Sequence, residues 1–203
     1  RALIAESLDV LYGSSAESQA AELAVSIAEA EGVLGTDKLV RYSLLAGERA
    51  LASYAHEEAL AHFQRGLAAK ADQPADAETG QLLHGLGRVQ VATLPPYELR
   101  EAVQTLGRSF DYFVDAGDVE RAVAVAEVPL PATAGYITGL GQLLYRALAL
   151  VPADSLQAAR LLASYARAAG LEDGNYQAAR EALDRALEIA RREGDPALEL
   201  RIL

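Results

Sequence analysis

Cysteine, methionine and tryptophan are absent from this chain of 203 residues, and histidine and phenylalanine occur only three times each. Without cysteine the chain can form neither a disulfide nor a thiolate nucleophile, which is compatible with a reducing compartment such as the cytoplasm. Because even residue 1 is not methionine, we expect the chain to be a fragment of a larger protein. The scarcity of aromatic residues and of β-branched runs disfavours β-sheet.

Basic residues are outnumbered, with 18 Lys and Arg against 29 Asp and Glu, for a net charge of −11. An acidic surface repels nucleic acid and anionic lipid, so we expect no direct binding to DNA, RNA or a membrane. No signal peptide is recognisable, and we expect a cytoplasmic location. The uncharged run 128–145 is long enough to span a membrane. Its prolines and glycines favour a loop that leads into a buried helix instead.

Sequence motifs for catalysis and cofactor binding are also lacking. The His56-Glu57-Glu58 stretch would need a second histidine at position 60 to bind zinc, and that residue is Leu60. The Gly-Leu-Gly stretches at 85–87 and 139–141 lack a third glycine and a preceding strand, and no Gly-Lys-Ser/Thr occurs. We therefore expect no catalytic residue, no metal site and no cofactor.

What the chain has in abundance is alanine and leucine, organised in a repeat. An arginine is followed by a small and then a large apolar residue four times, and the copies start 43, 38 and 39 residues apart. The four triplets are Arg65-Gly66-Leu67, Arg108-Ser109-Phe110, Arg146-Ala147-Leu148 and Arg185-Ala186-Leu187. A period of roughly 34 to 45 residues in a helical sequence indicates a solenoid of helix pairs.

Helix boundaries follow from capping residues, glycines and prolines. Ser14 and Asp154 each begin a capping-box pattern, Asp118 follows a glycine at a tight turn, and Asp195 precedes a proline. The expected helices span about 2–11, 16–31, 37–53, 56–70, 76–92, 97–115, 118–128, 133–150, 154–169 and 175–193, and an eleventh begins near 196. Short connections make neighbouring helices antiparallel. We predict an all-α fold, a single superhelical domain over residues 1–203 with ten to eleven antiparallel helices.

The small residues of the repeat are interpreted as packing positions. Ala59, Ala102 and Ala179 stand seven residues before the small residue of their triplets, and Leu140 breaks this rule in the third copy. Small side chains allow antiparallel helices to approach closely, whereas the arginines are expected to point into solvent. A glycine inside a helix costs about 1 kcal/mol relative to alanine, so Gly47 and Gly87 also indicate close packing.

Two segments carry a resemblance to a known repeat. Residues 45–63, which read LAGERALASYAHEEALAHF, and residues 175–190, which read NYQAAREALDRALEIA, resemble the tetratricopeptide (TPR) repeat. Pro152, five residues after Ala147, matches the proline that closes such a repeat. The match weakens in the middle of the chain, around Leu140, where we expect the largest departure from regular TPR geometry.

The whole chain also resembles the C-terminal TPR-like region of bacterial STAND-type ATPase regulators, of the LuxR/MalT-like or adenylate-cyclase-linked kind. Residues 39–48, which read LVRYSLLAGE, and residues 146–152, which read RALALVP, carry this resemblance. It implies a non-catalytic sensor or interaction module of a cytoplasmic signalling ATPase. The alternative hypothesis is a free-standing TPR adaptor that scaffolds a protein complex.

The TPR resemblance further implies a concave groove lined by the first helix of each pair. Around the two packing glycines, the candidate partner-binding residues are Arg41, Leu44, Glu48, Gln81, His84 and Arg88. The groove would take a protein, a peptide or a small-molecule effector. None of the six is the lysine or asparagine with which chaperone-binding TPR domains clamp a carboxylate, so that partner is disfavoured. The open C-terminal end also predicts possible self-association.

Overall fold

The computed structural model describes residues 36–131 and 134–202, and in these residues every regular element is a helix. They contain nine α-helices, one short 3-10 helix and no strand, which confirms the predicted all-α class. The helices expected at 2–11 and 16–31, and the capping box at Ser14, lie outside the described residues. Within the described residues, none of the helices is long and apolar enough to cross a membrane.

The chain divides into two compact units, with the boundary between Thr93 and Leu94, at the Leu-Pro-Pro insertion. Unit 1 extends to Thr93, and unit 2 comprises residues 94–203. The single continuous domain stays a prediction.

Unit 1 contains α3 (Thr36–Ala52), α4 (His56–Ala69) and α5 (Ala77–Thr93), each within one residue of its predicted bounds. Both α3 and α5 pack on α4 and on each other. Phe63 of α4 is fully buried in the centre of this core. A Cβ added to Gly47 of α3 would lie 2.6 Å from the Phe63 ring, and one added to Gly85 of α5 would lie closer still to the same ring edge. The absence of a side chain at both glycines therefore makes space for the Phe63 ring.

Lys70 fixes the connection between α4 and α5. Its side chain is only 4% exposed, and its Nζ donates to Asp76 at 2.5 Å and to Glu78 at 3.1 Å. Burial alone would lower the pKa of Lys70, but the hydrogen bonds to the two carboxylates outweigh burial and raise it. Burial alone would raise the pKa of Asp76, but hydrogen bonds from Lys70 and Thr79 lower it. Each group is therefore stabilised in its charged form by folding.

Replacing this lysine by methionine, Lys70→Met, is expected to lower the free energy of unfolding by roughly 1 kcal/mol at neutral pH. The loss is small because the carboxylates of Asp76 and Glu78 are partly exposed and water solvates them when the lysine is removed. The loss should shrink as pH falls through the lowered folded-state pKa of Asp76, and as pH rises through the raised folded-state pKa of Lys70. Urea unfolding of both proteins across pH measures this difference. Asp72→Asn, an exposed carboxylate of the same connection, serves as control. A pH-independent difference would contradict the ion-pair account.

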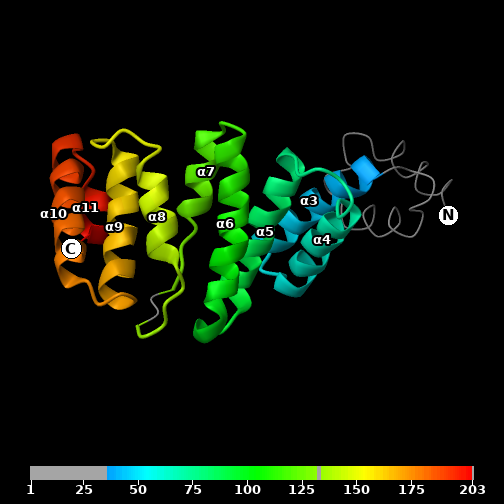
Figure 1. The fold of residues 1–203 in the computed structure, drawn as a ribbon, viewed down its shortest axis with the longest axis horizontal. Coiled ribbons are helices and arrows are strands. Elements are labelled where there is room, and N and C mark those ends of the chain that lie inside the picture. The colour runs from blue at the N-terminus through cyan, green and yellow to red at the C-terminus, as the bar shows by residue number, and fades with distance from the viewer. Residues whose placement is uncertain (1–35, 132–133, 203) are drawn as a thin grey trace. The chain divides into compact units, whose positions relative to one another are not determined.

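Unit 2 begins with the 3-10 helix η2 (Pro96–Glu98) and continues as a series of six α-helices. They are α6 (Leu99–Asp115), α7 (Val119–Ala126), α8 (Leu140–Leu148), α9 (Leu156–Leu171), α10 (Tyr176–Glu193) and α11 (Pro196–Ile202). Successive helices of this unit pack on one another, and α6 also contacts α8 (Figure 1). Asp118 caps α7 by accepting from the Arg121 amide, and Asp195 accepts from the Leu198 amide at 2.9 Å in α11, as predicted.

Two local predictions in unit 2 are wrong. The helix expected at 133–150 is only α8, because Gly135 and Gly139 adopt positive φ values of 86° and 90° and residues 134–139 are not helical. The N-cap of α9 is Ser155, whose side chain accepts from the Ala158 amide, and not Asp154. The side chain of Asp154 instead pairs with Arg185 of α10.

The repeat residues behave as packing positions. The small residues of all four triplets are buried, namely Gly66, Ser109, Ala147 and Ala186. Of the arginines, Arg108 and Arg146 are exposed, which agrees with their predicted solvation. The arginines also make contacts that the sequence did not predict, since Arg146 pairs with Asp111 of α6 at 2.5 Å. The repeat thus combines a buried small residue with an arginine that can reach a neighbouring helix.

Candidate functional site

The structure brings most of the predicted groove residues of unit 1 together. Four of them line a pocket of about 240 Å³ between α3 and α5, together with Leu45. These four are Leu44, Glu48, Gln81 and His84. Arg88 joins them through Glu48, to which it donates two hydrogen bonds of 2.9 Å. Arg41 is exposed one turn earlier on α3 and does not line this pocket.

The charges around this pocket are balanced within unit 1. The carboxylate of Glu48 is held by the Arg88 guanidinium. Burial is the main cause that lowers the pKa of His84, and the nearby Arg88 lowers it further, while Glu48 acts in the opposite direction. The histidine is therefore neutral at pH 7. The lining of the unit 1 pocket therefore includes a neutral histidine and a carboxylate, Glu48, whose charge is already paired with Arg88.

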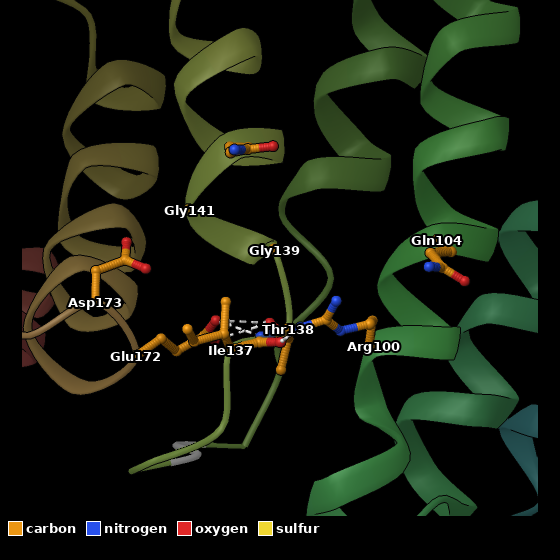
Figure 2. Close-up of a pocket in the computed structure, with 9 residues that line it drawn as sticks. Arg100, Gln104, Ile137, Thr138, Gly139, Gly141, Glu172 and Asp173 are labelled. Carbon is orange, nitrogen blue, oxygen red and sulfur yellow. Dashed lines mark hydrogen bonds between the residues drawn. The ribbon is translucent and has the colours of Figure 1, made fainter.

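A second candidate site lies in unit 2, at the point where the repeat departs from its pattern. A pocket of about 290 Å³ is enclosed by α6, by the segment before α8, by the start of α8 and by the residues after α9. Figure 2 shows Arg100 and Gln104 on the α6 side of this segment, and Glu172 and Asp173 on the α9 side. Gly141 and Gln142 of α8 complete the lining.

The segment before α8 is tied to both walls of the pocket. The guanidinium of Arg100 donates to the Ile137 carbonyl at 2.9 Å. On the other side, the carboxylate of Glu172 accepts from the Thr138 amide at 2.7 Å and from its hydroxyl at 2.8 Å (Figure 2). The Thr138 hydroxyl in turn accepts from the Leu140 amide at 3.1 Å. One peptide unit is thus held between a cation and an anion, and the pocket wall has a defined conformation.

A third pocket, of about 340 Å³, continues from this one along α8. It shares Gly141, Gln142 and Asp173 with the second pocket, and adds Tyr145, Arg146 and Tyr165. The two tyrosine rings lie 6.4 Å apart between centroids at an interplanar angle of 45°. We call the two pockets together the unit 2 groove, with its polar part around Arg100 and its aromatic part around the tyrosines.

The groove can form several kinds of noncovalent contact. Its lining offers two side-chain amides, two carboxylates, two guanidinium groups and two aromatic faces. Pockets that combine apolar surface with a few convergent polar groups are typical of ligand sites. In the described part of the chain, no group of three or more His, Cys, Asp or Glu side chains could hold a metal ion.

None of the unit 2 groove residues was predicted from the sequence, because they come from segments up to 73 residues apart. The signal that could have found them is the break of the repeat at Leu140, preceded by Gly139. Where the repeat pattern is lost, a loop can replace part of a helix. Loops on a rigid scaffold often carry binding residues.

Comparisons with protein-family models, with curated proteins and with solved structures find no match for the chain.

Proposed function

We propose that the chain is a non-catalytic interaction module whose unit 2 groove binds a peptide or small effector. The observation that carries this proposal is the continuity of the groove: two adjoining pockets share Gly141, Gln142 and Asp173, so one ligand can contact α6, α8 and α9 together. Ligand binding that bridges three helices changes how they pack on one another, and this is the property required of a sensor.

The finer architecture and the parent protein form part of the same proposal. The packing of successive helices on one another within each unit supports a TPR-like superhelix. The resemblance of residues 39–48 and 146–152 supports a place in a bacterial STAND-type ATPase regulator. There the module would act as the sensor arm, and effector binding would release the ATPase.

A matched pair of glycine variants tests the groove. A Cβ at Gly141 would lie 3.5 Å from a carboxylate oxygen of Asp173, an ordinary contact, so a larger side chain placed there enters the shared wall of both pockets. In Gly141→Phe we therefore expect loss of binding to peptides selected from a displayed random library on the unaltered chain. Gly107→Phe is the control, because a Cβ at Gly107 of α6 meets open space.

Retention of the selected peptides by Gly141→Phe would contradict the groove, provided that its thermal unfolding matches that of Gly107→Phe. Binding of duplex DNA by the isolated chain at about 150 mM salt would contradict the assignment to a module without direct nucleic-acid contact, because non-specific DNA binding at that salt requires a cationic surface.

A further inference from the structure

The aromatic part of the unit 2 groove holds a carboxylate that the fold leaves open. The side chain of Asp173 is exposed and lines both pockets. Among the described residues, no hydrogen bond or ion pair reaches this carboxylate. Tyr145, which is 68% exposed, and the half-buried Tyr165 stand beside it in the same pocket. A free anion next to two aromatic faces is the complement of an organic cation.

In the adjoining helices, an aromatic ring and a carboxylate together bind an arginine of the chain itself. The guanidinium of Arg146 lies 4.8 Å from the ring centroid of Phe110 and pairs with Asp111 at 2.5 Å. Stacking on a ring and pairing with a carboxylate therefore occur together in unit 2. Asp173 and the tyrosines repeat the acceptor half of this arrangement, and the arginine that lines the same pocket, Arg146, pairs with Asp111 and Phe110 instead.

We propose that the aromatic part of the groove binds the guanidinium of an arginine side chain from a peptide or protein partner. This inference rests on the proposed function and names the group that the groove recognises. The planar guanidinium can stack on a tyrosine while two of its N–H groups donate to the Asp173 carboxylate. The pocket volume of about 340 Å³ is at the small end of the roughly 300–1,000 Å³ range of ligand sites, which suits one side chain.

An anionic ligand is the less suitable occupant. The Arg146 guanidinium is engaged by Asp111 and Phe110, and the Arg100 guanidinium already donates to the Ile137 carbonyl. The net charge of −11 attracts cations to the chain and repels anions. The neighbouring polar part of the groove adds the amides of Gln104 and Gln142, which can bond to a peptide backbone that continues from the arginine.

The probe is a capped Gly-Arg-Gly tripeptide, titrated into the isotope-labelled 203-residue chain and followed by amide chemical shifts. We expect saturable shifts around α8 and the end of α9. A tripeptide with neutral citrulline in place of arginine should bind far more weakly, since it has the same shape without the charge. Propylguanidinium tests the free small cation, and should bind more weakly because it lacks the backbone.

Two variants with matched controls locate the site. Asp173→Asn should weaken tripeptide binding about fivefold, the usual size of one partly exposed ion pair. Tyr145→Leu should weaken it about threefold through loss of the stacking face, whereas Tyr145→Phe should keep it. Asp184→Asn and Tyr176→Leu remove an exposed carboxylate and an exposed ring of α10, outside the groove lining, and should leave binding unchanged.

Equal binding of the citrulline tripeptide, or unchanged binding by Asp173→Asn, would overturn the guanidinium assignment. Equal or tighter binding of propylguanidinium would overturn the peptide source. Absence of saturable shifts with every arginine compound would also overturn the inference. The proposed function fails separately: library peptides that lack arginine, lose affinity for Gly141→Phe and keep it for Asp173→Asn would support the groove and reject only the guanidinium.

Discussion

Gly85→Ala is expected to lower the free energy of unfolding of unit 1 by about 3 kcal/mol or more, although alanine favours a helix by about 1 kcal/mol. The added Cβ would collide with the Phe63 ring, which is fully buried and already in contact with Gly47 on α3. Since the ring meets both glycines along one edge, it cannot move away from α5 without pressing on α3. Urea unfolding monitored by circular dichroism measures the effect.

A compensating substitution separates the collision from a helix-propensity effect. Adding Phe63→Leu to Gly85→Ala shortens the side chain that the new Cβ meets, and should recover part of the lost stability. Gly107→Ala in α6 is the control, because a Cβ there has no neighbour within 4 Å and alanine should stabilise by about 0.5–1 kcal/mol. If Gly85→Ala were as harmless as Gly107→Ala, the close contact between α4 and α5 would be refuted.

The fold was largely predictable because its helix ends are marked locally. Asp118 and Asp195 cap helices where the sequence predicts caps, and the helices of unit 1 begin and end within one residue of their predicted bounds. These signals need only neighbouring residues. The tertiary partner of a small residue has no such local mark: a Cβ added to Gly85 would meet Phe63, and nothing in the neighbouring sequence indicates that contact.

The start of α8 shows why some local predictions fail. The sequence indicates a loop that leads into a buried helix in the uncharged run 128–145, but the predicted helix begins near 133, whereas α8 begins at Leu140. The non-helical residues 134–139 are held by two residues from elsewhere in the chain, Arg100 at Ile137 and Glu172 at Thr138. Those partners lie 37 and 34 residues away in sequence, so no local sequence pattern predicts the two contacts. The groove wall and the helix start were therefore missed together.

The two candidate sites also differ in how far the sequence predicts them. The TPR resemblance predicts four of the five residues that line the unit 1 pocket: Leu44 and Glu48 share a face of α3, and Gln81 and His84 share a face of α5. The unit 2 groove needs residues from α6, α8 and α9, and its aromatic face forms only where Tyr145 meets Tyr165 across two helices. Helical periodicity places residues on faces but does not say which faces meet.

Ala186→Leu tests the interpretation of the repeat as a packing mark, and should lower the free energy of unfolding of unit 2 by about 2–3 kcal/mol. Ala186 is completely buried in the core where α10 packs on α9 and α11, beside Ala159 and Leu198. Three added carbon atoms can enter this space only if the helices separate. Urea unfolding of unit 2, followed by tyrosine fluorescence and circular dichroism, measures the loss.

Arg185→Ala, one residue earlier, is the matched control. The arginine pairs with Asp154 and with Glu188, and the pKa of Arg185 is raised mainly by the hydrogen bond to Glu188 and the charge of Asp154. These contacts are at the surface, where water and salt screen them, so their removal should change stability far less than Ala186→Leu. The reverse order would mean that the arginine, and not the small residue, is the structural element of the repeat. The stacking account of the four triplets would then have to be replaced by one based on ion pairs between helices.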